Sequence, residues 1–256
     1  MKVSIITIVY NGSQTIKDAI ESVQGQDYDN IEYIVIDGNS TDGTQDIVRS
    51  YNGTISKFVS EADNGLYDAL NKGIKTATGD VIGLLHADDV YHDTNVITKV
   101  VNAFTNHNVD SLYGDLVYVN RKNTSKVVRY WRSGKYQKRN FLKGWMPPHP
   151  TFFVKSNILD KYGFYDTELK QAADYELMLR LLYKYDISTF YVPEIFVRMR
   201  VGGISNNSLK SRINANREDY QAWIKNNLSP RFYTTFMKPF SKIGQYFYQF
   251  RSRNIL

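Results

Sequence analysis

Short apolar runs alternate with amphipathic stretches through the first third of the chain. The apolar runs predict strands at Val3–Val9, Ile31–Ile36 and Ile55–Ser60, and at the start of Val81–Asp89. Helical apolar spacing occurs between these runs, over 16–23, from Ser40 or Thr41 through Val48, and over Leu66–Thr76. This alternation predicts a parallel sheet whose strands are joined by right-handed helical crossovers.

The pattern becomes less regular after Asp89. It predicts a helix over Thr94–Phe104, paired strands at Ser111–Asn120 and Lys126–Trp131, a helix over Tyr175–Tyr185, a strand at Ile187–Val192 and a turn at Gly202-Gly203. Lys135–Lys143 is basic and carries no clear structural signal. We expect Met146–Pro150 to be extended, because each proline disfavours helix in the residue before it.

The end of the chain repeats apolar residues at helical spacing. Phe232, Phe236, Phe240, Ile243, Phe247 and Phe250 share one helical face, which Pro239 interrupts. The opposite side carries Lys238, Lys242 and Arg251 and no acid, which predicts a helix lying on an anionic membrane surface. The alternative is that this face packs on the folded body or on a second subunit. We therefore divide the chain into a domain at 1–205 and a basic, aromatic helical segment at 206–256.

Composition excludes several classes of protein. The chain has no cysteine, which rules out disulfides and thiolate chemistry and fits a reducing compartment. Its four histidines form no HExxH motif, no apolar run reaches the roughly 18 residues of a membrane span, and the opening strand is too short for a signal peptide. The net charge of +6 arises after Asp219, where six basic residues and no acidic ones occur, so nucleic acid is not an expected partner.

Polar and acidic residues follow three of the predicted strands. Asp37 ends the second strand, Asp63 and Asn64 follow the third, and His86, Asp88 and Asp89 follow the fourth. The carboxyl ends of parallel strands meet at one edge of the sheet, where such folds bind ligands. Carboxylate oxygens there suit Mg²⁺ or Mn²⁺, which in turn hold diphosphates. The alternative for Asp88 and Asp89 is that one caps the next helix and the other faces water.

Six motifs occur in order across residues 4–182: SIITIVYNG, VIDGNSTDGT, SEADNGLYDALNKGI, GLLHADD, PHPTFF and AADYELMLRL. Together they resemble the family 2 inverting glycosyltransferases with the GT-A fold, especially bacterial enzymes that assemble capsule, O-antigen or colanic-acid-type exopolysaccharide. The resemblance implies an α/β fold with a GT-A-like, Rossmann-like, mostly parallel sheet. It also implies transfer of a sugar, with inversion, from a nucleotide-diphosphate sugar to a hydroxyl group.

The same resemblance implies a cofactor, partners and a location. The cofactor would be Mg²⁺ or Mn²⁺, the donor preferably a UDP-sugar, and the acceptor a saccharide, lipid-linked in surface polysaccharide synthesis. The protein would be cytoplasmic and peripheral at the inner face of the cell membrane, and a homodimer is an open option. Neither a dinucleotide motif nor a P-loop is present.

Residue roles follow from matching each motif. Asp88 would bind the metal, with His86 as a second candidate ligand because it replaces the family's usual first aspartate. The donor-binding residues would be Thr7, Tyr10, Asn11, Asp37, Asn39, Asp63, Asn64, Tyr67, Asn71, Lys72, His86, Ala87 and Asp88. His149, Arg200 and Ser205 would contact the acceptor or the diphosphate.

Asp174 is the candidate catalytic base. Displacement with inversion needs one carboxylate to take the acceptor's proton, and no second acid where a metal stabilises the leaving diphosphate. Asp174 matches the second residue of the family's Glu-Asp pair, whereas Ala173 replaces the first. The residues alone favour a plain cap for the following helix.

Two other functions remain open at this point. A sugar nucleotidyltransferase would need a glycine-rich basic loop after the first strand, and YNGSQTIKDAI supplies little of it. A non-catalytic nucleotide- or carbohydrate-binding protein is kept open by His86 and Ala173, and a turnover assay separates it from an enzyme.

Overall fold

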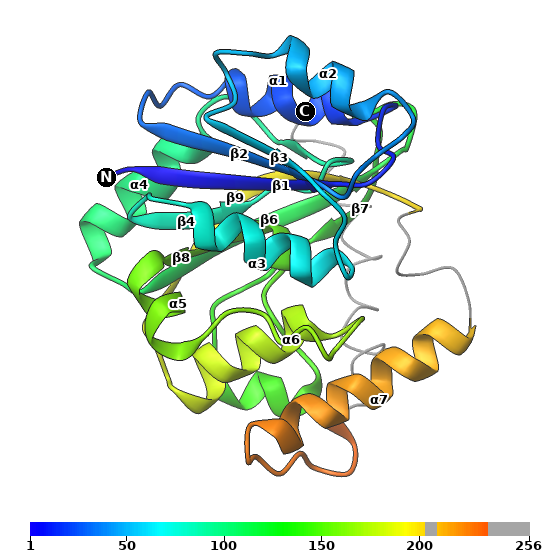
Figure 1. The fold of residues 1–256 in the computed structure, drawn as a ribbon. Helices are drawn as coiled ribbons and strands as arrows, with labels where there is room; N and C mark the ends of the chain where they lie inside the picture. The colour runs from blue at the N-terminus through cyan, green and yellow to red at the C-terminus, as the bar shows by residue number, and fades with distance from the viewer. Residues whose placement is uncertain (203–208, 235–256) are drawn as a thin grey trace.

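The computed structural model describes residues 1–202 and 209–234. Its strands form one sheet in the order β3-β2-β1-β4-β8-β6-β9-β5, with β7 paired to β6. Figure 1 shows α1 and α2 on one side of this sheet and α3, α5 and α6 on the other.

The first half of the sheet is parallel and carries the crossovers expected from the sequence. Its strands are β1 (Val3–Val9), β2 (Ile31–Asp37), β3 (Lys57–Ser60) and β4 (Val81–Leu84). The connecting helices are α1 (Ile16–Gln24), α2 (Thr44–Ser50) and α3 (Leu66–Thr76). Parallel pairing of β1 with both β2 and β4, and of β2 with β3, brings the carboxyl ends of these strands to one edge.

The second half of the sheet mixes strand directions. Its strands are β5 (Val90–Tyr91), β6 (Ser111–Val119), β7 (Val127–Trp131), β8 (Phe152–Lys155) and β9 (Thr189–Arg200). β8 runs antiparallel to β4 and β6, β7 is antiparallel to β6 as predicted, and β9 is parallel to β6. The α/β prediction is confirmed, and the parallel character is concentrated in the N-terminal half.

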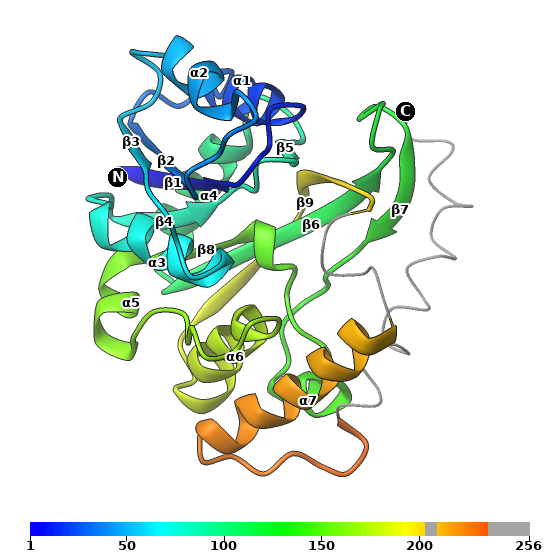
Figure 2. The same cartoon turned by 45° about the vertical axis from the view of Figure 1, so that its right-hand side comes forward.

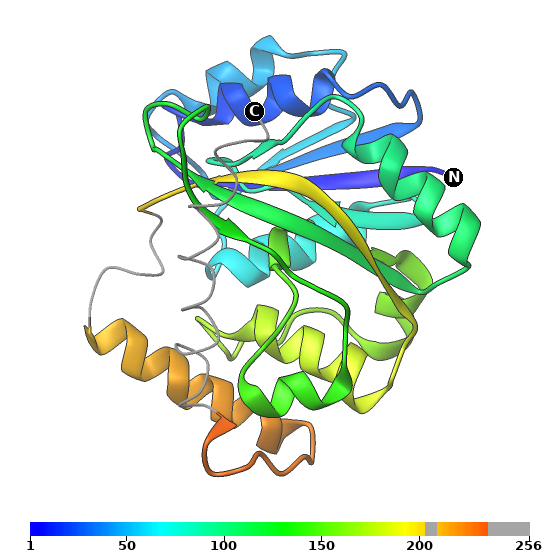
Figure 3. The ribbon, with the colours of Figure 1, turned by 180° about the vertical axis from the view of Figure 1, so that it is seen from behind.

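The remaining helices complete both faces of the sheet. They are α4 (Val96–His107), α5 (Ser156–Tyr162), α6 (Ala173–Met178) and α7 (Leu209–Lys225), with 3₁₀ turns at Lys138–Lys143 and His149–Thr151 and a π-helical continuation of α6 over Leu179–Lys184. Figure 3 shows α4 from behind, beside the long strands β6 and β9.

Two separate apolar clusters form the core. One packs α1 and α4 on the sheet through Ile20, Val100 and their neighbours. The other packs α3, α5 and α6 on the opposite face and includes Leu70 and Leu177. Because successive strand residues point to opposite faces, β8 supplies Phe152 to the second cluster and Phe153 to the first.

Several expected boundaries are wrong. α2 begins at Thr44 rather than at Ser40 or Thr41, because Gly43 adopts a left-handed φ of +92° that ends the preceding loop. The extended segment stops at Pro148, and residues 149–151 form a 3₁₀ turn, since proline is tolerated in the first turn of a helix. The strand expected at Ile187–Val192 begins at Thr189 and runs on to Arg200.

α7 packs on the outside of α6, away from the sheet, as Figure 2 shows. Its inward stripe includes Ala222 and Trp223, both fully buried within the second cluster. The outward residues Ile213, Tyr220 and Ile224 are exposed. Residues 1–202 and 209–234 contain no helix that is both long and apolar enough to cross a membrane. The aromatic face predicted beyond Thr234 lies outside the described residues.

Candidate active site

The rim of the sheet is built around Asp37, the last residue of β2. This carboxylate is fully buried, and its Oδ2 accepts hydrogen bonds from the Ser40 N–H at 3.0 Å and the Ser60 hydroxyl at 2.6 Å. Within the described part of the chain, its Oδ1 has no partner. A buried carboxylate oxygen without a donor is costly, so a donor from a bound ligand would stabilise it.

The loops after β1 and β2 are joined by hydrogen bonds. Asn11 and Asn39 both adopt left-handed backbone conformations, with φ of 50° and 65°. The Asn11 N–H donates to Ser40 Oγ at 2.7 Å, and Asn11 Oδ1 accepts from the Thr41 N–H at 2.9 Å. Asn11 therefore ties the loop after β1 to the loop after β2, and the side chain of Asn39 is exposed.

Tyr10 and Asp63 flank the backbone beside Asp37. Tyr10 is 69% exposed. A Cβ added at Gly38 would lie 2.6 Å from Asp63 Oδ2 and 3.3 Å from the Tyr10 ring, so only glycine lets both side chains approach the backbone here. Asp63 Oδ1 accepts from the Gly65 N–H at 2.8 Å. An aromatic face beside carboxylate acceptors is suited to a nucleobase and its N–H groups.

Four predicted donor-binding residues are engaged in holding the fold. Thr7 is fully buried, and its hydroxyl accepts from Tyr33 at 3.1 Å. Asn71 bonds both backbone groups of Tyr165, at 2.8 and 3.0 Å. Lys72 donates to the Ala62 carbonyl at 2.9 Å and pairs with Glu61 and Asp68, whereas the Asn64 N–H donates to Asp68 at 3.0 Å.

Asp174 lies inside the first turn of α6, because the helix begins at Ala173. The N-cap interpretation is therefore wrong. Its Oδ1 accepts from the Tyr67 hydroxyl at 3.3 Å and from the Tyr175 N–H at 2.8 Å. No hydrogen bond to Oδ2 occurs among the described residues, which leaves that oxygen able to accept a proton.

Tyr67 and Asp174 belong to a chain of polar side chains that reaches the end of β4. The Tyr67 ring stacks on Tyr165 with centroids 5.6 Å apart, and the Tyr165 hydroxyl lies 2.7 Å from His149 Nε2. The rings of His149 and His86 are 5.8 Å apart. The structure thus places His86, His149 and Asp174 in one cluster, although they come from three distant parts of the chain.

Both histidines of this cluster favour the neutral form. Burial lowers the pKa of His149 to about 4, although nearby Asp174 opposes the shift and His86 adds to it. Burial also lowers the pKa of His86, against the opposing charges of Asp88 and Asp174. A neutral imidazole keeps a lone pair for a metal ion or a hydrogen bond.

Arg200 supports the loop that carries Asp88. Its guanidinium donates to the Asp88 carbonyl at 2.7 Å and to the Arg121 carbonyl at 3.2 Å, and it pairs with Asp18 of α1. The Arg200 N–H donates to the buried carboxylate of Asp89 at 3.2 Å, and burial raises the pKa of that carboxyl well above its usual range. Arg200 thus braces this loop, and Ser205 lies outside the described residues.

The residues at the end of β4 fit a divalent cation shared with a diphosphate. No group of three metal-ligating side chains occurs in residues 1–202 and 209–234. Mg²⁺ and similar ions are commonly held by one or two carboxylates together with substrate phosphates, so Asp88 and neutral His86 suffice on the protein side.

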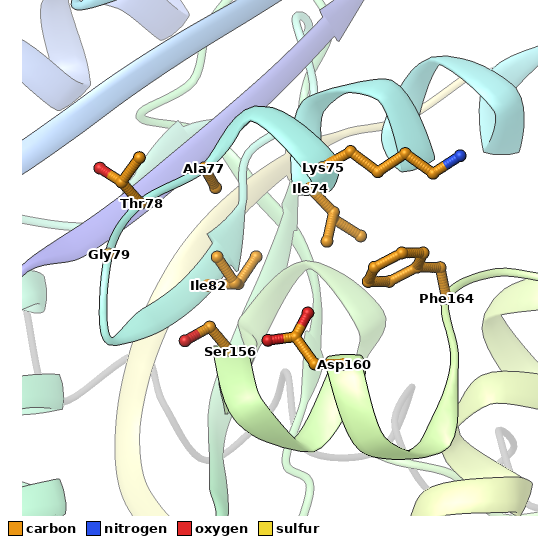
Figure 4. Close-up of a pocket in the computed structure, with 9 residues that line it drawn as sticks. All are labelled: Ile74, Lys75, Ala77, Thr78, Gly79, Ile82, Ser156, Asp160 and Phe164. Atoms are coloured by element: carbon orange, nitrogen blue, oxygen red, sulfur yellow. The ribbon is translucent and has the colours of Figure 1, made fainter.

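A separate pocket lies at the opposite end of β4 (Figure 4). Ile74, Ile82 and Phe164 supply its apolar lining, and Asp160 of α5 faces into it. It lies near Gly79, where β4 is about to begin, whereas Asp88 follows the other end of the strand. It is therefore distinct from the rim.

Tyr165 is the site residue that the sequence did not reveal. It sits in an irregular segment between α5 and α6, with no motif around it, and only the contacts to Asn71 and His149 identify it. Burial, together with the nearby charge of Asp174, raises the pKa of Tyr165 above its usual range.

Comparison with known proteins shows which family the chain belongs to. The chain matches the family described as "Glycosyl transferase family 2" over residues 4–162. It is 35% identical over 184 residues to an uncharacterized glycosyltransferase of Mycobacterium tuberculosis, covering 70% of this chain and 68% of the relative.

Solved structures share the fold at lower sequence identity. Residues 1–349 of S. aureus TarS, in complex with UDP-GlcNAc, have a TM-score of 0.67 and 19% identity, covering 88% of this chain and 65% of that TarS chain. The mannosyltransferase PcManGT of Pyrobaculum calidifontis, in complex with GDP-Man and Mn²⁺, has a TM-score of 0.65 and 18% identity, covering 96% of this chain and 69% of that chain.

The fold is therefore the GT-A type of α/β domain, and the protein is a glycosyltransferase. The chain belongs to glycosyltransferase family 2.

Proposed function

We propose that this glycosyltransferase moves a sugar from a nucleotide-diphosphate donor to a hydroxyl group, with inversion at the anomeric carbon. The observation that carries the proposal is the single catalytic-type carboxylate. Asp174 is oriented by Tyr67 on one oxygen, with the other oxygen unengaged among the described residues, and the His149–Tyr165 pair lies beside both this carboxylate and the His86 ring.

The donor's base and ribose would bind between Tyr10 and Asp37. The exposed Tyr10 ring offers a stacking face. Acceptors are offered by Asp37 Oδ1, which has no partner in residues 1–202 and 209–234, and by the Asp63 carboxylate. Asn11 and Asn39 shape the edge of this crevice. A UDP-sugar is our preferred donor. The structures similar in fold contain UDP-GlcNAc in one case and GDP-Man in the other.

The reaction needs one base. Asp174 Oδ2 takes the proton of the acceptor hydroxyl as its oxygen bonds to the anomeric carbon. The bond from that carbon to the diphosphate oxygen breaks, and the nucleoside diphosphate leaves with the electron pair. A divalent ion at Asp88 and His86 would supply charge neutralisation for the diphosphate. His149, held by Tyr165, would donate to or contact the acceptor or the diphosphate.

The acceptor would be a lipid-linked saccharide of bacterial surface polysaccharide, met at the inner face of the cell membrane. The outward side of α7 supports this location, because Ile213, Tyr220 and Ile224 are exposed there. The sequence after Asp219 adds basic residues and no acids. We keep 206–256 as the membrane-facing segment of the protein and 1–205 as its catalytic domain, with a homodimer as a further option.

Calorimetry tests the donor and the metal together. UDP, GDP and dTDP are titrated into the protein in chelator and again with Mn²⁺. We expect one nucleotide to bind about tenfold or more tightly with Mn²⁺, since carboxylate and diphosphate repel each other without a cation. Asp88→Ala should remove that gain, and Asp160→Ala, at the far pocket, should keep it.

If each of the three nucleotides binds with the same affinity in chelator as in Mn²⁺, the metal site is contradicted. Turnover of a nucleotide-sugar panel then identifies the donor, and the anomeric configuration of the product shows whether the sugar is inverted. Retention of configuration would contradict the single-base reaction.

A further inference from the structure

α7 holds the segment that carries Tyr165 and Asp174. Its inward side chains reach this segment at several points, from Asp166 before α6 to Glu176 within it. The family match ends at residue 162, so both this segment and α7 lie beyond it. Figure 2 shows α7 lying along α6 on the side away from the sheet.

The start of α6 has no cap of its own. The first N–H groups of a helix lack intrahelical partners, and a side-chain oxygen at the N-cap position usually accepts from them. In α6 that position is Ala172, which has no such oxygen. The next residue, Ala173, also has only a methyl group.

Glu218 of α7 binds the backbone at this N-cap position and at the residue before it. Its Oε2 accepts from the Gln171 N–H at 2.6 Å and from the Ala172 N–H at 3.0 Å. The carboxylate thus bonds two N–H groups two and three residues before Asp174. Its negative charge also suits the positive end of the helix.

Other α7 contacts fix the helix on neighbouring turns. Trp223 Nε1 donates to the Tyr175 hydroxyl at 2.9 Å, and Asn226 donates to Glu176 at 2.9 Å, both in the interior. Lys225 pairs with Asp166 and Glu168 at 2.5 Å each. Glu218 differs from these three contacts, because it bonds backbone N–H groups two and three residues before Asp174.

We propose that Glu218 is a positioning residue that sets the start of α6 and so aims Asp174 at the acceptor hydroxyl. This inference rests on the proposed function, in which Asp174 is the base. Without the cap, the backbone at 171–172 loses two charge-assisted hydrogen bonds and the first turn frays. A displacement of about 1 Å at a reacting group can lower a rate about a hundredfold.

The test compares three variants on the nucleotide sugar that the wild-type chain turns over, with water as acceptor and nucleoside diphosphate release as readout. Glu218→Ala removes the cap. Glu218→Gln keeps an oxygen that can accept both N–H bonds but removes the charge. Glu168→Gln is the matched control, because it loosens an α7 contact through Lys225 without touching the start of α6.

We expect Glu218→Ala to lower kcat about ten- to a hundredfold with the donor KM changed less than about twofold. Glu218→Gln should have most of the wild-type kcat, and Glu168→Gln should have the wild-type kcat. Amide exchange at Gln171 and Ala172 should speed up only in the Ala variant. The KM for the donor should be unchanged, because the proposed donor site is formed by the loops after β1, β2 and β3. The α7 contacts described above do not involve these loops.

Two results would overturn the inference. One is a Glu218→Ala variant with unchanged kcat. The other is an equal loss of kcat in Glu218→Ala and Glu168→Gln, which would mean that α7 acts through general stability. Failure of the proposed function is distinct, since it shows as a wild-type chain that turns over no nucleotide sugar, or as full activity in Asp174→Asn. Amide exchange at residues 171 and 172 shows whether Glu218 protects these N–H groups, whether or not the proposed function is correct.

Discussion

Two aspartates at the rim each keep one carboxylate oxygen without a partner among the described residues. In Asp37 this oxygen is fully buried beside the crevice, and in Asp174 it lies at the first turn of α6. In both, hydrogen bonds to the other oxygen hold the carboxylate in place. The two carboxylates are therefore held in the same way, and the proposed reaction gives them opposite tasks: Asp37 would bind a donor's N–H or hydroxyl, and Asp174 would take an acceptor's proton.

Replacing Asp174 with asparagine tests its task. The amide oxygen can still accept from Tyr67 and the Tyr175 N–H, so the fold should hold, but an amide cannot take a proton. Loss of one positioned base typically costs about 10² to 10⁴ in rate. We expect kcat for nucleoside diphosphate release to fall by that factor, with the calorimetric Kd of the nucleotide unchanged. Near wild-type turnover would leave Asp174 with a structural role only.

Single residues were predictable where a motif marks a strand end. Asp37, Asp63, His86 and Asp88 were all placed at the rim from the sequence, because each follows a strand of a parallel sheet. Whether a residue binds ligand or holds the fold was not predictable. Asn71 belongs to a family motif, yet both its amide groups bond the backbone of Tyr165, which is 94 residues away.

At the scale of elements, Glu32 joins three parts of the parallel sheet. It lies on β2 and accepts from Ser4 Oγ of β1 at 2.5 Å, from Lys2 at 2.9 Å, and from the Thr78 N–H before β4 at 2.7 Å. Its burial tends to raise its pKa, but the hydrogen bonds from Ser4, Thr78 and Lys2 outweigh this and lower the pKa to about 2 from a usual 4.5.

This shift predicts how stability depends on pH. A carboxyl with a depressed folded-state pKa contributes stability above its unfolded pKa, and the contribution fades as pH falls from 4.5 to about 2. The contribution is up to about 3 kcal/mol at neutral pH. Urea unfolding should show Glu32→Gln less stable than wild type at neutral pH, with the difference shrinking through this window.

Glu194→Gln is the control for that measurement, because Glu194 is an exposed carboxylate paired with Lys99. Its difference from wild type should be small at every pH. A Glu32→Gln variant whose deficit stays constant down to pH 2.5, inside the window set by the shift from 4.5 to about 2, would show that Glu32 acts by packing rather than by its charge.

Elements with strong local periodicity were predicted well. α3 has the expected bounds, and β1 and β2 agree within one residue. β8 and α5 were not predicted, because the apolar run Phe152–Val154 follows a proline-rich loop and shows no alternation. α7 was not delimited either. Its inward stripe carries Glu218 and Asn226, whose partners just before α6 and within it no local pattern could indicate.

At the scale of the whole molecule, the C-terminal part has two sides with different partners. The inward side of α7 is part of the core, with Trp223 fully buried. Just beyond α7, the Thr234 hydroxyl donates to the Leu142 carbonyl at 2.9 Å, so the chain is attached to the domain up to that residue. Ile213, Tyr220 and Ile224 face outward, and Phe232 is 90% exposed.

The membrane proposal therefore concerns the outward residues of 209–234 together with the sequence of 235–256, which lies outside the described residues. That sequence carries Phe236, Phe240 and Phe247 with Lys238 and Lys242 and no acid. Each basic residue near an anionic surface adds about 1 kcal/mol, and aromatic burial adds to it. We expect full-length protein to sediment with vesicles containing phosphatidylserine, to sediment less with neutral vesicles, and to be released by high salt, because screening weakens the attraction.

Truncation after Thr234 separates membrane binding from packing, since it keeps every buried contact described for α7 and the residues after it. The truncated protein should lose most vesicle binding and keep its thermal unfolding temperature and its nucleotide affinity. If it sediments as well as the full-length chain, 235–256 does not bind the membrane. If it unfolds at a markedly lower temperature or loses nucleotide affinity, the aromatic face of that segment packs on the protein itself, because only a face that contributes to the folded state lowers its stability when removed.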